Sequence, residues 1–294
     1  MTSAPPAVIT GASGFVGRRL TGHFPGAAAL ALGGEDWRER IEAAPVAGAT
    51  VFHLAARVHR AGNQDEAKFQ RDNVEKTEML ARTAAKRGAT HLVFMSSVKV
   101  LGEESDIALT TEAPYAPEDA YGRSKQRAEE VLRAVGRETR LPVTIVRSPL
   151  VYGAGAGGNL AALRRLCDSA WPLPFGGIRN RRSWIHVDDL ATLLAACAQP
   201  GGAPFRIFHA AHPSPLATPD LVSGLRGALG RPPRLVSVPP AMVEAAATLV
   251  GKAAAARRLT RSLLLDGMAA TRELGWSATR HAEQAFKDLA RGLA

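Results

Sequence analysis

An apolar segment near the N-terminus runs directly into a loop with three regularly spaced glycines, and this feature constrains the fold more than any other. The segment Ala7–Thr10 is followed by GASGFVG and by a helical pattern from about Phe15 to His23. In a strand–loop–helix unit, glycines permit a tight turn, backbone approach to a pyrophosphate and close helix packing. The context favours a dinucleotide-binding loop over an ordinary glycine-rich turn. The loop residues expected to contact the dinucleotide are Gly11, Ser13, Gly14, Phe15, Val16 and Gly17.

The first half of the chain alternates short apolar runs with helical patterns, which is typical of a parallel sheet covered by helices on both faces. Six runs read as strands: Ala7–Thr10, Ala28–Leu32, Thr50–Leu54, His91–Ser96, Val143–Arg147 and Arg206–His209. They predict an α/β fold with a doubly wound parallel sheet of the Rossmann type. After about Tyr152 the sequence becomes rich in Gly and Pro, which indicates a smaller lobe. We therefore expect a dinucleotide-binding domain in residues 1–153 and 185–212, and a substrate-binding lobe in 154–184 and 213–294.

Composition excludes several classes of function. The chain has 294 residues, 46% of them hydrophobic, and can bury a large core. The formal net charge is +10, but Arg and Lys are scattered singly and aromatic residues amount to only 5%, so we expect no nucleic-acid partner. Anionic small substrates suit this charge equally well.

Cysteine spacing and hydropathy narrow the classes further. Cys167 and Cys197 have neither a disulfide-framework nor a metal-ligand spacing, so no metal site is expected. The alanine-rich stretch from Ala241 to Ala256 is interrupted by Glu244 and Lys252, and it predicts a soluble helix rather than a membrane span. The first residues show no targeting pattern. The expectation is a cytoplasmic protein with no membrane partner.

Two acidic residues follow the second expected strand, at the place where a dinucleotide site usually holds the adenosine ribose. A carboxylate about twenty residues beyond the glycine loop accepts hydrogen bonds from the ribose hydroxyls. Glu35 and Asp36 occupy this place. The alternative is that they only cap a helix beginning near Trp37, because Asp is common at helix starts.

Hydroxyl groups end the fourth expected strand, and a tyrosine and a lysine begin a later helix. The strand starting at His91 ends in Ser96 and Ser97, and the helix starts with Tyr121-Gly-Arg-Ser-Lys125. The four-residue spacing places Tyr121 and Lys125 on one helix face. A nearby ammonium favours the phenolate, so we expect the pKa of Tyr121 to fall below its usual value. Tyr121 would then exchange a proton with a sugar hydroxyl that Ser97 holds by a hydrogen bond.

These motifs, in this order, resemble the extended short-chain dehydrogenase/reductase superfamily, and within it the nucleotide-sugar epimerase/dehydratase family. The likeness is strongest to UDP-hexose 4-epimerases and UDP-sugar 4-ketoreductases. It extends over nearly the whole chain in the segments GASGFVG (11–17), VFHLAA (51–56), DNVEKT (72–77), FMSSVKVLGE (94–103), YGRSK (121–125), RSPLVYG (147–153), GNL (158–160) and RSWIHVDDLA (182–191).

The resemblance implies a role for individual residues. Ser97, Tyr121 and Lys125 match the catalytic serine, the acid/base and the ribose-binding lysine. The resemblance also implies an NAD site, with NADP as an alternative. Its further residues are the strand end at His53, Leu54, Ala55 and Ala56, a helix position at Asn73, and Pro149 near the nicotinamide. The implied substrate contacts are Ser97, Lys99, Asn159, Leu160 and Arg182.

A direct physical argument also supports Arg182 as a contact to the substrate diphosphate, because a planar guanidinium binds two phosphate oxygens at once. The neighbouring Arg179 and Arg181 either share this role or belong to a solvated basic loop. His186 is expected to pack or to position the loop rather than to perform chemistry.

Two departures from the family pattern limit the activity. The dehydratase branch carries an acidic pair directly after the catalytic Ser/Thr, but Val98 and Lys99 stand there, so dehydration is disfavoured. The segment between Gly17 and Val51 has space for one strand and its helix where the family normally has two. One strand of the sheet is therefore expected to be missing near the adenosine end.

Three functions remain open from the sequence. The first is a UDP-sugar 4-epimerase with bound NAD, and the second is a one-way 4-reductase of a UDP-4-keto-6-deoxy sugar with an exchangeable nicotinamide. The third is a non-catalytic relative that binds a nucleotide sugar. The resemblance also implies a homodimer, to which the helix containing Tyr121 to Val135 would contribute.

Overall fold

The sheet expected from the sequence forms the centre of the molecule. The computed structural model describes residues 6–58, 65–199 and 202–291. Six parallel strands lie in the order β2-β1-β3-β4-β6-β9. The strands are β1 (Ala7–Thr10), β2 (Ala28–Leu30), β3 (Thr50–His53), β4 (His91–Ser97), β6 (Val143–Ser148) and β9 (Phe205–His209). All six expected strands are confirmed, with small differences at their ends.

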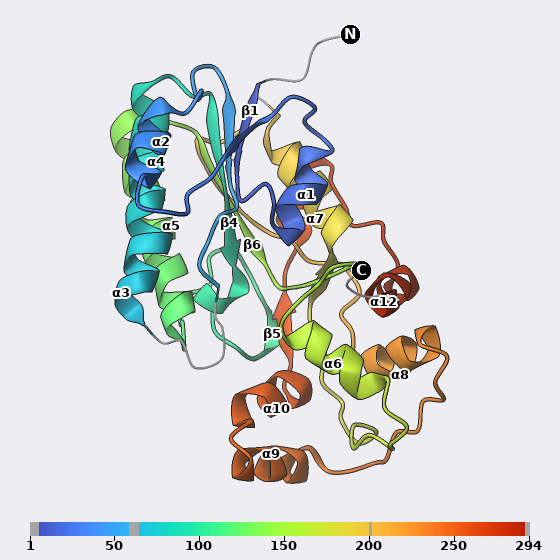
Figure 1. The fold of residues 1–294 in the computed structure, drawn as a ribbon. Helices are drawn as coiled ribbons and strands as arrows, with labels where there is room; N and C mark the ends of the chain where they lie inside the picture. Colours follow the sequence, from blue (N-terminus) through green and yellow to red (C-terminus); the bar gives the residue numbers. More distant parts are fainter. Residues whose placement is uncertain (1–5, 59–64, 200–201, 292–294) are drawn as a thin grey trace.

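Helices cover both faces of this sheet, as Figure 1 shows. One face packs under α1 (Phe15–Thr21), α7 (Val187–Cys197) and α11 (Met268–Leu274), and the other under α2 (Trp37–Ala43), α4 (Lys76–Lys86) and α5 (Ala120–Thr139). The strands are buried on both sides, and alternate residues serve the two layers. Ile9 and Phe52 belong to the first layer, and Val8 and Val51 to the second.

A single strand, β2, lies between Gly17 and Val51, and it forms the edge of the sheet. The structure therefore confirms the shortened segment. The chain leaves β1 toward β2 on one side and returns to β3 on the other side of β1. This reversal of strand order lies at the carboxyl ends of β1 and β3, where open α/β sheets have the crevice in which ligands bind.

Short elements complete the chain. Three short helices pack against α5, namely α3 (Glu66–Phe69), the π-helix η1 (Gln70–Glu75) and the 3-10 helix η2 (Val98–Val100). Four short strands lie outside the main sheet: β5 (Ser105–Leu109), β7 (Leu150–Tyr152), β8 (Trp184–His186) and β10 (Leu263–Leu265). Strand β10 pairs with β5, and β7 pairs with β8, both in parallel. The lobe is thus connected to the sheet domain by strand pairing.

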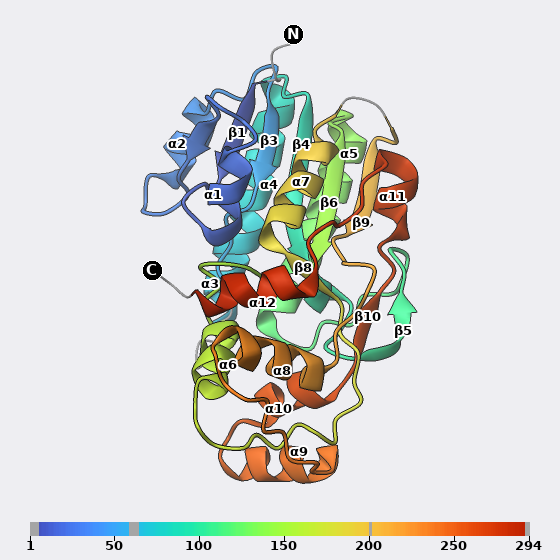
Figure 2. The same ribbon diagram turned by 90° about the vertical axis from the view of Figure 1, so that its right-hand side faces the viewer.

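The lobe itself is helical (Figure 2). Helices α6 (Asn159–Cys167), α8 (Thr218–Ala228) and α12 (Ala282–Ala290) share one apolar core, while α9 (Pro240–Leu249) and α10 (Ala253–Thr260) lie at the far end. The side chain of Asn159 lies outside the described part of the structure. Helix α11 falls in the stretch expected for the lobe, but its Ala270 packs in the layer with α7.

The alanine-rich stretch from Ala241 to Ala256 is divided between α9 and α10 rather than forming one helix. Gly251 lies between them with φ +69, in the left-handed region that ends helices. The expectation of a single helix was therefore wrong, because the glycine breaks it. No helix in the described ranges is both long and apolar enough to cross a bilayer.

Candidate active site

The glycine loop is packed so tightly that larger residues are excluded. Gly11 has φ +72, and a Cβ there would lie 2.8 Å from the backbone nitrogen of Ala55. A Cβ at Gly17 would lie 2.1 Å from the carbonyl oxygen of Gly11. Ser13 and Gly14 are exposed at the crevice, whereas Val16 and Gly17 are buried beneath them. An exposed backbone loop at the switch point is the cradle that a dinucleotide pyrophosphate needs, so these residues fit the cofactor.

Buried hydrogen bonds join this loop to the end of β3. The Thr10 hydroxyl accepts from the N–H groups of Leu54 and Ala55, both at 3.1 Å, and shares a 2.7 Å hydrogen bond with His53 Nδ1. The other His53 nitrogen lies 2.8 Å from the Thr77 hydroxyl. Burial, assisted by the charge of Lys125, lowers the pKa of His53 to about 3, so the ring is neutral. Sequence reasoning missed Thr10 and Thr77 because only the fold brings them to His53.

Asn73 fixes the backbone beyond β3. It lies in η1 and is almost fully buried. Its amide nitrogen donates to the Arg57 carbonyl (3.0 Å) and to the Ser124 hydroxyl (2.9 Å), and its amide oxygen accepts from the Arg57 N–H (2.7 Å). Asn73 therefore ties the strand end to α5. The structure places it beside the crevice with its amide engaged in these three bonds.

Glu35 and Asp36 follow β2, and the alternative to a ribose contact was that they only cap α2. Asp36 stands at the start of α2 but makes no side-chain cap, so that part of the capping interpretation was wrong. Its carboxylate instead receives two hydrogen bonds from Arg40, at 2.6 and 2.8 Å. Glu35 is exposed on the same turn. The carboxylate of Asp36 is thus engaged locally, and Glu35 stays the candidate for the ribose.

The fold brings Ser97, Tyr121 and Lys125 together. Asp119 caps α5 by accepting from the Gly122 N–H at 2.6 Å, and this sets the first turn of the helix beside the end of β4. The Ser97 hydroxyl lies close enough to the Tyr121 phenol to lower its pKa. Lys125 is buried one turn further on, donates to the Met95 carbonyl at 2.8 Å, and lies 4.3 Å from the Phe94 ring centroid.

The electrostatics of this set differ from the sequence expectation. Burial raises the pKa of Tyr121 to about 12; the Ser97 hydrogen bond lowers it, and the Asp119 charge raises it again. Burial also lowers the pKa of Lys125 to about 7. The expected fall of the Tyr121 pKa was therefore wrong for the protein by itself, because burial disfavours the phenolate more than the Ser97 hydroxyl favours it.

Lys99 is engaged by carboxylates rather than presented freely to a substrate. Its Nζ lies 2.5 Å from Asp119 Oδ2 and 2.6 Å from Glu103 Oε1. Glu103 in turn pairs with Arg258 of α10 at 3.0 Å. This network links the loop after Ser97, the start of α5 and the lobe. Sequence reasoning missed this network, because many charged residues were equally eligible partners of Lys99.

A second charged group lies inside the protein directly behind the site. Glu129 is one turn beyond Lys125 on α5 and is fully buried, as is Arg147 of β6. The Glu129 carboxylate accepts from Arg147 at 2.7 Å, from the Ser96 hydroxyl at 2.5 Å and from the Tyr115 hydroxyl at 2.9 Å. Sequence reasoning missed Glu129, although its spacing from Tyr121 and Lys125 repeats the same helix face.

Arg182 lies where the lobe meets the sheet domain. Its guanidinium donates to the Arg261 carbonyl at 2.9 Å and to the Glu103 carbonyl at 3.4 Å, and within the described residues it forms no ion pair. Burial lowers its pKa, and Tyr152 and Glu103 lie close enough to oppose this. A half-buried cation held by neutral carbonyls is suited to an anionic ligand.

The other expected lobe residues occupy different environments. Arg179 donates to the Gly176 and Ile178 carbonyls, and Arg181 is exposed, as a solvated basic loop would be. Leu160 is buried in the lobe core, and Pro149 is buried beyond β6. His186 is buried and caps α7 by accepting from the Asp188 N–H at 3.2 Å.

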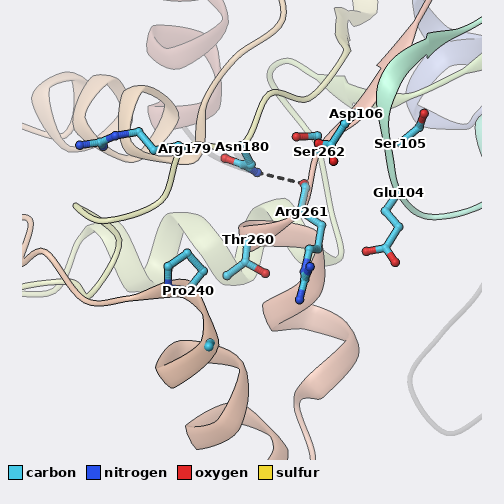
Figure 3. Close-up of a pocket in the computed structure, with 10 residues that line it drawn as sticks. Glu104, Ser105, Asp106, Arg179, Asn180, Pro240, Thr260, Arg261 and Ser262 are labelled. Atoms are coloured by element: carbon cyan, nitrogen blue, oxygen red, sulfur yellow. Dashed lines mark hydrogen bonds between the residues drawn. The ribbon is translucent and has the colours of Figure 1, made fainter.

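A cavity of about 640 Å³ lies within the lobe, between β5, α9 and the start of β10 (Figure 3). Figure 3 shows Asn180 reaching the Arg261 carbonyl, to which Arg182 also donates. The lining residues are Glu104, Ser105, Asp106, Arg179, Asn180, Pro240, Ala241, Thr260, Arg261 and Ser262. Ser97, Tyr121 and Lys125 are not among these lining residues, so the cavity is separate from the candidate catalytic residues.

A glycine loop at the switch point and a Ser–Tyr–Lys set beside it define a dinucleotide-dependent oxidoreductase site. A family model described as the NAD dependent epimerase/dehydratase family matches residues 7–209. The chain belongs to this family.

Individual relatives agree with the family. The chain is 32% identical over 249 residues to a UDP-glucose 4-epimerase of Vibrio cholerae, covering 83% of this chain and 76% of the relative. It is 28% identical over 191 residues to a UDP-2-acetamido-2,6-beta-L-arabino-hexul-4-ose reductase of Pseudomonas aeruginosa, covering 62% and 46%. The structure of RMD from Pseudomonas aeruginosa, complexed with NADPH, superposes with a TM-score of 0.77 at 19% identity over 98% of both chains, which is a likeness of fold.

Proposed function

We propose that the protein carries out nicotinamide-dependent oxidoreduction at C4 of a UDP-hexose, as a UDP-sugar 4-epimerase. The observation that carries this proposal is that Ser97, at the end of β4, acts on the Tyr121 phenol, one helical turn from the buried Lys125 of α5. The likeness to the Vibrio cholerae UDP-glucose 4-epimerase supports it. The residues Val98 and Lys99, with no acidic pair after Ser97, speak against dehydration.

The protein residues manage the proton in this reaction. A bound oxidised nicotinamide supplies a hydride acceptor at C4, and its positive charge favours the Tyr121 phenolate. Tyr121 takes the proton from the C4 hydroxyl when the sugar is oxidised and returns it when the ketone is reduced. Ser97 holds the same sugar oxygen through its hydroxyl. Lys125 is proposed to bind the ribose of the nicotinamide nucleotide, which is the role that the family resemblance implies.

Arg182 is the proposed contact to the diphosphate. Two phosphate oxygens fit a guanidinium, and the present partners of Arg182 are neutral carbonyls. Lys99 is proposed to act on the substrate through Ser97 and Asp119, because its own charge is paired. Asn159 and Leu160, at the start of α6, stay proposed as the loop that meets the diphosphate.

The first experiment identifies the cofactor. Freshly purified protein is denatured, and any released dinucleotide is identified by chromatography and mass. Near-stoichiometric NAD is the result expected for an epimerase, which regenerates its cofactor in each cycle. An empty protein that oxidises added NADPH with a UDP-4-keto sugar would overturn the epimerase in favour of the 4-reductase, which the likeness to the Pseudomonas aeruginosa reductase makes the second candidate.

The second experiment tests the acid/base. Tyr121→Phe should lower the conversion of UDP-glucose to UDP-galactose by about 10²–10⁴-fold, while dinucleotide and UDP binding persist. Tyr115→Phe is the matched control, because its hydroxyl contacts Glu129 behind the site and not the crevice. Full activity of Tyr121→Phe would refute the mechanism. A wild-type protein that binds UDP-sugar without turnover would support the non-catalytic alternative.

We also propose that the chain forms a homodimer in the cytoplasm. The family resemblance supports pairing through α5, which packs beside α4 on the outer layer of the sheet domain. The free, buried thiols of Cys167 and Cys197 are in keeping with a reducing compartment. Sedimentation velocity gives the mass in solution, and a monomer across the accessible concentration range would contradict the dimer.

A further inference from the structure

The ion pair between Glu129 and Arg147 lies directly behind the candidate catalytic residues. The side chain of Glu129 is fully buried, and that of Arg147 keeps only 2% of its surface exposed. Taking two charges out of water costs as much as their attraction returns in many proteins, and an apolar pair of similar volume is often just as stable. Stability alone is therefore a weak reason for this pair, and the contacts of Glu129 with the site indicate a second role.

Helix α5 holds the end of β4 through two neighbouring contacts. Lys125 Nζ donates to the carbonyl of Met95 at 2.8 Å, and Glu129 Oε1 accepts from the hydroxyl of Ser96 at 2.5 Å. The next residue along the strand is Ser97, which acts on the phenol of the candidate acid/base. Glu129 therefore fixes β4 one residue before the hydroxyl that the reaction uses.

The carboxylate of Glu129 is itself held in one orientation by Arg147. The guanidinium donates from Nη2 to Oε2 at 2.7 Å, and its Nε lies 3.1 and 3.2 Å from the two carboxylate oxygens. Arg147 lies on β6 opposite Ser96, and its Nη1 donates to the Thr111 carbonyl at 3.0 Å. Contact with both oxygens fixes the geometry of such a pair as well as its energy. The carboxylate is therefore set by two strands and a helix.

Glu129 also places a negative charge near a buried cation. Lys125 is 2% exposed, and the contacts described for its ammonium are the uncharged Met95 carbonyl and the Phe94 ring. Burial lowers the pKa of Lys125 to about 7, and the charge of Glu129 raises it. Because burial disfavours the charged form of an amine, Lys125 would lose its proton at lower pH without this carboxylate.

The other titratable groups around Lys125 do not replace Glu129. His53 on β3 and His209 on β9 are neutral near pH 7, because burial lowers their pKa values to about 3 and about 4. Arg147 on β6 carries a charge of the same sign as Lys125. Asp119 lies before the first turn of α5, where its charge raises the pKa of the phenol instead.

We propose that Glu129 is a positioning residue of the active site, which holds the end of β4 through Ser96 and places a negative charge one helical turn from Lys125. It acts through these neighbours and not by contact with the sugar. The proposal rests on the proposed oxidoreductase function and adds a residue to it. It also gives the buried ion pair a role in activity beyond its role in stability.

The pH dependence of turnover tests the charge of Glu129. Glu129→Gln keeps the size of the side chain and removes the charge. The alkaline limb of kcat/KM for UDP-glucose, which we expect to report the ammonium of Lys125, should move to lower pH by about one unit, so that activity above neutral pH falls about tenfold.

Two controls accompany this variant. Glu130→Gln changes the next residue of α5, which is exposed and accepts a hydrogen bond from Gln126, and it should leave the profile unchanged. Tyr115→Phe removes one neutral hydrogen bond to Glu129 but leaves its charge, so the alkaline limb should also stay in place.

A double variant separates activity from folding. Glu129→Gln leaves the Arg147 charge buried without its counter-ion and should lower the urea midpoint. Glu129→Gln/Arg147→Met removes both charges and should recover the midpoint, but its alkaline limb should stay at lower pH because Lys125 still lacks the carboxylate. Recovery of the wild-type profile together with the midpoint would overturn the proposal and leave the pair a structural role only.

Binding of NADH distinguishes a failure of this proposal from a failure of the proposed function. Because Lys125 is the proposed ribose contact, NADH affinity, measured by fluorescence, should decline at lower pH in Glu129→Gln than in wild type. A wild type that binds NADH without converting UDP-sugar would refute the proposed function, while the two binding profiles would still decide the role of Glu129. Identical binding and turnover profiles would overturn the positioning role alone. A wild type that binds no NADH would overturn both.

Discussion

The two sides of the candidate site are built from different interactions. On the cofactor side, Thr10, His53 and Asn73 are buried and joined by uncharged hydrogen bonds. On the lobe side, Lys99 and Arg258 are joined by salt bridges to Glu103, and these side chains keep 19–26% of their surface exposed. Uncharged buried networks hold one geometry, because each missing bond leaves an unsatisfied polar group.

The salt bridges have a different consequence. Partly exposed ion pairs respond to pH and ionic strength, and exchanging one partner is less costly. We therefore expect the cofactor side to be rigid. The lobe side is expected to adjust more easily, and its salt bridges are linked to the start of α5 through Asp119. Three measurements test this contrast, beginning with the largest expected effect.

Asn73→Ala should have the largest effect on stability. It leaves the Arg57 N–H and carbonyl and the Ser124 hydroxyl without this partner, so the free energy of unfolding should fall by about 3 kcal/mol. Urea denaturation measures this change. Gln126→Ala, which removes a hydrogen bond to Glu130 on the exposed side of α5, is the control and should stay near wild type. Equal small losses in both variants would show that the cofactor side is not rigidly determined.

The ring of His53 predicts a dependence of stability on pH. Its pKa is about 3 in the folded protein and about 6.5 in the unfolded chain, so the unfolded chain takes up the proton first. Stability is then fully present above the unfolded value and is lost as pH falls from about 6.5 toward 3. Between pH 7 and pH 5, His53 alone accounts for ~2 kcal/mol of unfolding free energy. Urea titrations at these two pH values test this, and an unchanged midpoint would contradict a neutral buried ring.

Lys99→Met should give the smallest effect, and on activity rather than on stability. Removing the ammonium leaves the Asp119 charge uncompensated, and that charge raises the pKa of Tyr121. The pH–rate profile should shift to higher pH by about one unit, which is about a tenfold loss at neutral pH. Lys99→Arg keeps the charge and should restore the profile. A loss of activity with no shift would instead indicate that Lys99 contacts the substrate directly.

The sheet was predictable because its pattern is local. Each of the six strands is an apolar run bounded by turns, and the Tyr121–Lys125 spacing places both residues on one helix face whatever surrounds them. Ser97 could be added because it ends an apolar strand run and because the family resemblance gives that position a role.

What could not be predicted depends on contacts distant in sequence or on burial. The partners of Lys99 were chosen by the fold among many equivalent carboxylates. The pKa of Tyr121 depends on how deeply the phenol is desolvated, which spacing does not reveal. The side of α9 that turns inward depends on Glu244, whose carboxylate Thr260 and Arg261 hold by hydrogen bonds.

The shortened edge of the sheet has a consequence for solubility. Strand β2 has only three residues and no neighbour beyond it in the described structure. An uncovered edge is a template on which another chain can add a strand, and proteins protect such edges by keeping them short. The loss of a strand at this edge therefore does not expose a long unpaired edge strand. The exposed edge strand has three residues, which are too few for stable pairing with another chain. The chain should therefore resist edge-to-edge aggregation as it folds.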